Sequence, residues 1–125
     1  MNDCIFCKII KGEIPSKKIY EDEKVLAFYD ISPEAPVHFL VIPKEHIVSA
    51  NDITEENAEV VSHIFVVINK IARELKINET GYRIVNNCGE QGGQTVGHMH
   101  FHVLGQEIWS GHQANGKTKF IDISN

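Results

Sequence analysis

The sequence predicts an α+β domain with a largely antiparallel sheet and one long helix. Strand-like apolar segments occur both before and after a single amphipathic helical segment, and the other connections are too short for a second helical crossover. The length of 125 residues is close to one average domain, and 42% hydrophobic with 23% charged residues is ordinary globular usage. We expect one working domain over residues 1–105, followed by a tail over residues 106–125, where the apolar pattern ends.

The first predicted elements are a short N-terminal helix and two strands. Residues 4–10 are mostly apolar and stop at Gly12, with Pro15 just beyond, which is typical of a brief helix. Two strand patterns follow at residues 25–29 and 38–42. Because the second is almost entirely apolar after its first residue, we place it centrally in the sheet, covered on both faces.

The long helix is the clearest element. Apolar residues recur at three- and four-residue spacing over residues 58–75, which predicts an amphipathic helix on one sheet face. Thr54 is in position to cap its N-terminus, and Asn78 or Gly81 is in position to end it.

Composition narrows the class of protein. The formal net charge of -5 disfavours nucleic acid and anionic membranes as main partners. No stretch approaches the roughly 20 apolar residues that span a bilayer, and the N-terminus lacks a secretion signal, so we expect a cytoplasmic protein. Three cysteines are too few for a disulfide scaffold, and seven histidines, about twice a typical share, indicate imidazole chemistry.

The last two strands are predicted at residues 82–85 and 98–104, joined by the glycine-rich run 86–95. In the final strand His98, His100 and His102 alternate with apolar residues. Successive strand side chains point to opposite faces, so the imidazoles share one face, roughly 7 Å apart at a rise of about 3.3 Å per residue.

Three interpretations of this histidine row remain open from the residues alone: a solvated edge, a metal site and a nucleophilic site. The outer two histidines are about 13 Å apart by the same rise, so all three cannot share one ion. A neutral imidazole is also a nucleophile toward phosphorus, and the glycine-rich run with the Thr95 hydroxyl offers donors for phosphate oxygens.

The heptapeptide His98-Met99-His100-Phe101-His102-Val103-Leu104 resembles the His-φ-His-φ-His-φ-φ signature of the histidine triad (HIT) superfamily. The similarity covers roughly residues 4–105 and resembles the Hint branch of that superfamily. The resemblance implies a HIT-like five-stranded antiparallel sheet that continues across a homodimer. It also implies a nucleotide-binding hydrolase that splits the P–N bond of purine nucleoside 5′-phosphoramidates, or acyl adenylates, with no cofactor required for catalysis.

The resemblance further assigns roles to single residues. His100 would be the nucleophile, forming a nucleotidyl-histidine intermediate that water opens to release a nucleoside monophosphate. His102 would hold a non-bridging phosphate oxygen. His38 would support the nucleophile, and a backbone carbonyl on the other ring nitrogen would fix the tautomer. Asp30 would bind the ribose hydroxyls, since one carboxylate accepts from both.

Two further sets follow from the same resemblance. The apolar base pocket would comprise Ile5, Phe6, Ile9, Phe28, Ile31 and Leu40. The phosphate and leaving-group side would comprise Asn87, Gly93, Gln94 and Thr95. The alternative for each apolar residue is plain core packing.

Cys4 and Cys7 form a Cys-x-x-Cys pair, which supplies two of the four ligands of a structural zinc. His46 and His98 are the candidates for the other two ligands, because the resemblance extends to relatives that bind zinc through this cysteine pair and two histidines. Zinc would then leave His100 and His102 free. The alternative is that both cysteines are small buried apolar side chains.

The C-terminal tail departs from the Hint pattern, because it has no Trp-Pro-Pro-Gly ending. Leaving-group specificity is therefore open, and we expect the tail to lie at a dimer interface, with Trp109 packed there, or to be disordered. A nucleotide-binding regulatory module with little turnover is the alternative function. A metal-dependent hydrolase built on the histidine row is less favoured, because no carboxylate is placed by the sequence beside it.

Overall fold

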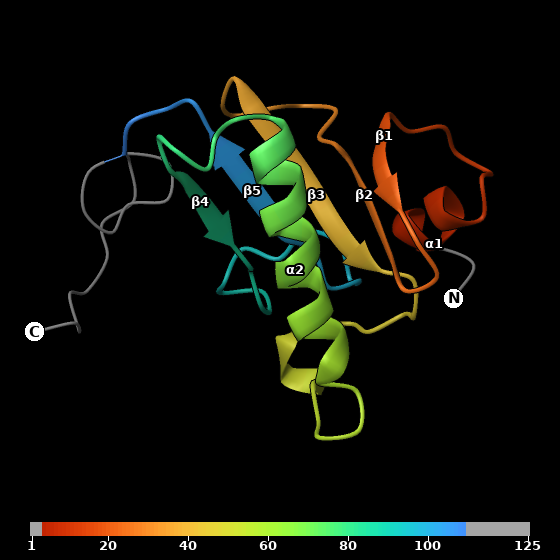
Figure 1. Cartoon of the computed structure of the whole chain (residues 1–125). Helices are drawn as coiled ribbons and strands as arrows, with labels where there is room; N and C mark the ends of the chain where they lie inside the picture. Colours follow the sequence, from red (N-terminus) through yellow and green to blue (C-terminus); the bar gives the residue numbers. More distant parts are fainter. Residues whose placement is uncertain (1–3, 110–125) are drawn as a thin grey trace, which may run out of the picture.

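The computed structural model, which describes residues 4–109, is built on a five-stranded antiparallel sheet with helices on both faces (Figure 1). Its strands in chain order are β1 (Lys18–Glu21), β2 (Val25–Tyr29), β3 (Val37–Pro43), β4 (Tyr82–Val85) and β5 (Phe101–Gly105). Their order in the sheet is β1-β2-β3-β5-β4, with every neighbouring pair antiparallel. The predicted fold class is confirmed, including the central position of β3.

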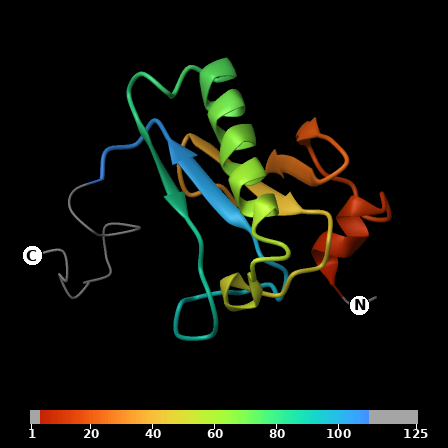
Figure 2. The ribbon, with the colours of Figure 1, turned by 60° about the horizontal axis from the view of Figure 1, so that its bottom comes forward.

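Three helical segments complete the fold. They are α1 (Ile5–Ile10), a short 3-10 turn η1 (Ala50–Asp52) and α2 (Glu59–Glu74). α2 crosses the front of the sheet in Figure 1, whereas α1 lies beside β1 and β2 near the N-terminus; Figure 2 gives a second view of this arrangement. In the described part of the chain, no helix is long and apolar enough to cross a membrane.

The alternation of side chains along the strands divides the core between the two sheet faces. The face under α2 contains the larger cluster, which includes Met99, Phe101 and Val103, as the alternation in the histidine segment predicts. The opposite face packs against α1. Its buried members are Phe6, Ile9, Leu26, Phe28, Leu40 and Ile42. α1 therefore covers part of the face opposite α2.

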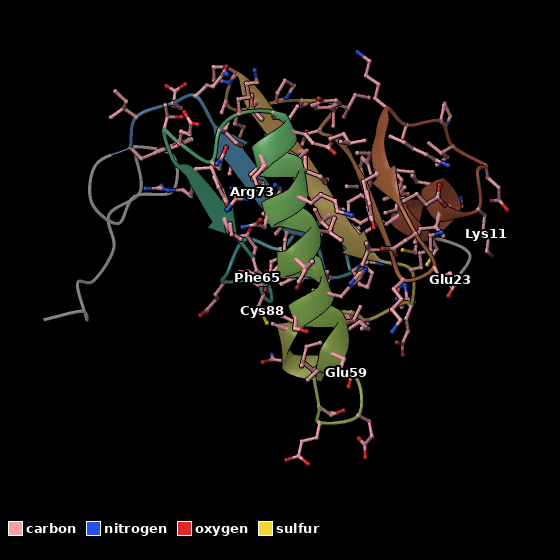
Figure 3. The ribbon with its side chains drawn as sticks, viewed as in Figure 1. Lys11, Glu23, Glu59, Phe65, Arg73 and Cys88 are labelled. Carbon is pink, nitrogen blue, oxygen red and sulfur yellow. The ribbon has the colours of Figure 1, made fainter. Side chains whose placement is uncertain are left out.

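The N-terminus of α2 differs from the prediction. The Thr54 hydroxyl accepts from the Glu56 N–H at 3.2 Å, and this interaction caps a turn that precedes the helix. The helix itself starts at Glu59, and its N-cap residue Ala58 makes no side-chain cap. Glu59 in the first turn and Arg73 in the last, both labelled in Figure 3, complement the helix dipole.

The C-terminus of α2 also differs from the prediction of Asn78 or Gly81. Lys76 adopts the left-handed conformation at φ 62°, and its N–H donates to the Arg73 carbonyl. The Ile77 N–H donates to the Ala72 carbonyl at 3.0 Å, and Ile77 is fully buried. This is a Schellman motif with lysine in the place that glycine usually takes, and burial of Ile77 offsets the backbone strain.

The strand boundaries hold two further differences. β1 was not predicted from the sequence. This strand has four residues, of which two are apolar, and its pairing with β2 is irregular between Lys18 and Tyr20. β5 starts at Phe101 rather than at residue 98, so His98 and His100 precede the strand and only His102 lies within it. The part of the predicted tail from residue 110 onward lies outside the described residues.

Candidate functional site

The segment before β5 is held in place by backbone contacts from two directions. The Met99 N–H donates to the Ile47 carbonyl at 2.6 Å, and the Asn86 side-chain amide donates to the His100 carbonyl at 2.9 Å. The ring centroids of His100 and His102 are 5.0 Å apart. The two imidazoles therefore meet on the sheet face that carries α1, closer together than a regular strand predicts.

The tautomer of His100 is fixed by the backbone of its own segment. Its Nδ1 lies 2.8 Å from the His98 carbonyl oxygen, which only accepts, so Nδ1 carries the proton. The Nε2 lone pair is then free in the neutral ring. The ring is buried at 3% exposure and packs edge-on against Phe6, with centroids 5.1 Å apart. This arrangement presents one nucleophilic nitrogen in a fixed direction.

His102 has the opposite arrangement of its ring nitrogens. The Glu34 backbone N–H donates to His38 Nδ1 at 3.0 Å, so the neutral His38 ring carries its proton on Nε2. That Nε2–H donates to His102 Nδ1, also at 3.0 Å, and the proton of neutral His102 is therefore on Nε2. His38 thus contacts His102 rather than His100, so any support that it gives to His100 is indirect.

The imidazoles of this site are held in the neutral state. Burial lowers the pKa of His102 to about 4, with further lowering from His100 and His38. Burial also lowers the pKa of His38 and of His100, although Asp30 acts in the opposite direction on both. At neutral pH the site therefore offers an uncharged donor and an uncharged nucleophile side by side.

Two neighbouring cavities border the histidines. The larger of them, of about 540 Å³, lies between α1, β2 and the histidine segment. His100 and His102 are among the residues that line it. The predicted base-pocket residues all line it: Ile5, Phe6, Ile9, Phe28, Ile31 and Leu40. Ile31 is 97% exposed at the rim, whereas Phe6, Phe28 and Leu40 are buried. The shape and apolar walls suit a flat aromatic group next to the two imidazoles.

The smaller cavity, of about 390 Å³, shares Asp30, Ser32, Thr95 and His102 with the larger one. It continues past His102 to His38, Glu34, Asn87 and Gly93, and β4 and β5 close it with Val85 and Leu104. The side chain of Asp30 is 17% exposed, and its Oδ2 lies 3.5 Å from His38 Nε2. The two cavities therefore meet at His102, with Asp30 and Thr95 at the junction.

Gln94 borders neither cavity. Its side-chain amide donates to the carbonyls of Val48 and Val96, and its Oε1 accepts from the Gly89 N–H, so the side chain braces the glycine-rich loop. Asn87 has a similar second contact, because its amide donates to the Gly92 carbonyl at 2.8 Å. A Cβ at Gly92 would collide with the Cys88 carbonyl, so this turn requires glycine.

The four residues predicted to bind metal converge on one point. The donor atoms of Cys4, Cys7, His46 and His98 all lie within 4.8 Å of one another. Cys4 Sγ is 3.3 Å from His98 Nδ1, and Cys7 Sγ is 3.2 Å from His46 Nδ1. Zinc–sulfur and zinc–nitrogen bonds of about 2.3 and 2.0 Å give a tetrahedral edge of ~3.6 Å, so these spacings fit the ion.

The protonation of His98 also suits a metal. Its Nε2 is 2.8 Å from the Pro43 carbonyl oxygen, so the proton is on Nε2 and the Nδ1 lone pair faces the two thiols. Asp30, His38 and His102 form a second cluster of donor atoms, but the Glu34 N–H already occupies His38 Nδ1 and keeps the proton on Nε2. That second cluster does not fit a metal.

Sequence reasoning missed two contacts that set the geometry of the site. The Glu34 N–H and the Asn86 amide fix His38 and the His100 backbone respectively. The prolines on both sides of Glu34 indicate a rigid loop close to His38, which is the one signal available for the first contact. Trp109 lies beneath the Arg83 guanidinium, 4.9 Å from its ring centroid, so it has a partner within its own chain.

Comparison with known proteins supplies the family context. The family model described as the HIT domain matches residues 11–108. A histidine triad protein of known structure from Clostridium difficile is 53% identical, with a TM-score of 0.87 over 90% of this chain and 98% of that chain. A HIT family hydrolase from Legionella pneumophila is 44% identical, with a TM-score of 0.84 over 86% of this chain and 96% of that one. An uncharacterised HIT-like protein of Buchnera aphidicola is 48% identical over 83% of this chain and 91% of its own length.

Proposed function

The chain belongs to the HIT domain family, and from that premise we propose that it is a purine nucleoside phosphoramidase of the Hint type. In this proposal it hydrolyses the P–N bond of nucleoside 5′-phosphoramidates, and the related bond of acyl adenylates, and releases a nucleoside monophosphate. The likeness to a HIT family hydrolase agrees with enzymatic activity of this class.

The observation that carries the proposal is the pairing of His100 and His102. The ring centroids of these two neutral imidazoles are 5.0 Å apart. His100 has a free Nε2 lone pair, and His102, where the two cavities meet, has a free Nε2–H. A nucleophile and a hydrogen-bond donor for phosphate oxygen are the two groups that covalent transfer at phosphorus needs.

The reaction would proceed in two displacements. His100 Nε2 bonds to phosphorus while the P–N bond breaks, and the departing nitrogen takes up a proton from solvent and leaves as an amine. The resulting ring is cationic, and its Nδ1–H donates to the His98 carbonyl throughout. Water then attacks phosphorus and loses a proton, and the restored neutral His100 departs. His102 holds a non-bridging oxygen in both steps.

The larger cavity supports a nucleoside as the constant part of the substrate. Apolar walls formed by Phe6, Phe28 and Leu40 suit a purine base, and Asp30 lines the same cavity as the two histidines. Its Oδ1 accepts from the Ser32 N–H at 2.7 Å, which orients the carboxylate toward ribose hydroxyls. Thr95 and Asn87 line the smaller cavity, where they would contact the transferred phosphate and the leaving group.

We include two assembly features in the proposal. Cys4, Cys7, His46 and His98 would hold a structural zinc that ties α1 to the loop after β3, with no part in the chemical steps. Two copies of the chain would associate along β4, which is at the edge of the sheet, so that the sheet continues across the homodimer. Light scattering on the purified protein tests the second feature.

Mass spectrometry after rapid mixing with adenosine 5′-phosphoramidate tests the chemistry. We expect a mass increase of one adenylyl group, localised by peptide mapping to His100, together with release of AMP. Release of AMP with no trapped adduct, and with full activity in His100→Ala, would contradict the covalent mechanism. Binding of AMP without any turnover would instead favour the regulatory module.

A further inference from the structure

The charges around the smaller cavity are unbalanced. Among the described residues that line it, Asp30 and Glu34 carry charge, and neither a lysine nor an arginine is present. Burial lowers the pKa of His38 and His102, so the two imidazoles are uncharged at neutral pH and do not offset the carboxylates. The cavity wall is therefore anionic.

Arg83 is the basic residue to consider beside this wall. It pairs with Leu104 across the two strands, but its guanidinium stands over the Trp109 ring, 4.9 Å from the centroid, and it does not line the cavity. The Glu34 carboxylate, in contrast, acts on the site itself, since its charge opposes the lowering of the His38 pKa. Its charge therefore acts at His38, the hydrogen-bond partner of His102.

The position of this cavity matches the part of the substrate that departs. In the proposed reaction a nucleoside in the larger cavity has its phosphate at His100 and His102. The smaller cavity shares His102 with the larger one but is not lined by the attacking His100. Whatever extends from the phosphoramidate nitrogen past His102 comes to lie beside Glu34. Glu34 is exposed, so its side chain is free to meet such a group.

We propose that Glu34 makes this enzyme selective for substrates whose leaving amine carries a second, positively charged group. The inference rests on the proposed function and extends it to the substrate class. An ammonium or guanidinium at the far end of the leaving amine is attracted to the Glu34 carboxylate, whereas a carboxylate there is repelled. Glu34 acts here through its charge, and its backbone N–H to His38 is a separate contribution.

The test uses three adenosine 5′-phosphoramidates with straight-chain amines of equal length that end in an ammonium, a carboxamide or a carboxylate. The wild-type full-length protein is expected to show a kcat/KM for the ammonium compound that is about tenfold or more above that for the carboxylate compound. Added salt should reduce this ratio, because the interaction is between partly exposed charges.

Glu34→Gln should lower the ammonium-to-carboxylate ratio by roughly threefold to tenfold, the effect of one partly screened charge. Glu34→Lys changes the charge by two units and should lower the ratio by about the square of that factor. Both variants keep the backbone N–H, and unchanged thermal melting verifies their folding. The matched control is Glu90→Gln, which removes an exposed carboxylate that does not line the cavity and should leave the ratio unchanged.

Equal ratios in the wild type, Glu34→Gln and Glu34→Lys would overturn the inference while leaving the phosphoramidase proposal intact. If none of the three compounds is cleaved, the proposed function fails, and the charge preference is then read from their dissociation constants. A wild-type preference for the ammonium compound in binding that Glu34→Lys reverses would still support the role of Glu34.

Discussion

His98 and His102 lie four residues apart in one motif, yet they serve different regions of the molecule. His98 faces two thiols and His46 in the proposed zinc site, whereas His102 lines both cavities and His100 lines the larger one. His98, His100 and His102 are all imidazoles with lowered pKa values, so residue type does not distinguish them. They differ in the hydrogen-bond partner of one ring nitrogen. This partner is the Pro43 carbonyl for His98, the His98 carbonyl for His100 and the His38 side chain for His102.

Backbone carbonyls therefore fix the tautomers of His98 and His100, whereas the His38 side chain fixes that of His102. A carbonyl on Nε2 leaves Nδ1 for a metal, and a carbonyl on Nδ1 leaves Nε2 for phosphorus. In this proposal the zinc site uses His98 and the reacting pair uses His100 and His102, so the two sites do not compete for a ring. Four perturbations test this division, beginning with the one of largest expected effect.

His100→Ala should lower the rate of P–N cleavage by about 10⁴-fold or more, because the group that bonds to phosphorus is lost. AMP should still bind within about fivefold of the wild-type affinity, since the base and ribose contacts remain, and bound zinc should be unchanged. Steady-state kinetics, calorimetry and metal analysis measure the three quantities. His63→Ala on α2, a histidine that lines neither cavity, is the matched control; turnover retained in His100→Ala would remove the division of roles.

The double variant Cys4→Ser, Cys7→Ser should lower stability and leave the cleavage rate nearly unchanged, the opposite of His100→Ala. Loss of the thiolates removes the metal, and we expect the melting temperature to fall by about 10 °C or more, as for other structural zinc sites. The value of kcat should stay within about threefold, while KM rises because α1 carries part of the larger cavity. Thermal melting and kinetics at a temperature below the transition measure both. A double variant with no zinc and unchanged melting would show that the cluster is not a structural metal site.

Acidification should lower the free energy of unfolding through His102. Its pKa of about 4 in the folded protein is below the 6.5 of an unperturbed histidine, so the unfolded chain binds more protons between these values. The contribution of His102 to the free energy of unfolding is fully present above about pH 6.5 and is lost as the pH falls toward 4. The loss at pH 5 is ~2 kcal/mol. Urea unfolding at pH 7.5 and 5.0 measures the loss, and His102→Gln should show a smaller one. An equal loss in the variant would assign the pH dependence elsewhere.

Asn86→Ala should give the smallest effect. The amide of Asn86 contacts the His100 carbonyl and no metal ligand, so kcat should fall by about fivefold, equivalent to the ~1 kcal/mol of one hydrogen bond. The zinc content of Asn86→Ala should equal that of the wild type. Adding Asn86→Ala to the Cys4→Ser, Cys7→Ser double variant should not lower its melting temperature further. Loss of zinc in Asn86→Ala would mean that the two regions are coupled through the segment between them.

Sequence periodicity predicted the elements whose burial repeats along the chain. α2 and β3 were predicted because their apolar residues follow the helical period or fill a whole strand. β1 was missed because a four-residue edge strand has too few positions to show alternation, and the end of α2 was missed because Lys76 takes a conformation that glycine usually signals. The start of β5 was placed too early, since alternation in His98 to His100 persists where sheet pairing does not.

The candidate site was predicted as a set of residues rather than as a network. The signature and its resemblance identified the residues around the cavities, but the protons on His38, His98 and His100 depend on the Glu34 N–H and on two carbonyls. Cys4 and His98 are 94 residues apart, so no local pattern shows that they touch. Such tertiary contacts have no local signal in a single sequence. The roles themselves remain predictions for the experiments above.

The short helix α1 limits how this protein can be redesigned. Its six residues and their cap present thiols to the metal cluster and also present Ile5, Phe6 and Ile9 to the larger cavity. An engineer who reshapes the proposed base site by replacing Ile5 or Ile9 also disturbs the segment that carries the thiols of the proposed zinc site. Replacements at Phe28 or Leu40, on the sheet, change the same walls from a scaffold with no thiols, and are the safer route to altered base selectivity.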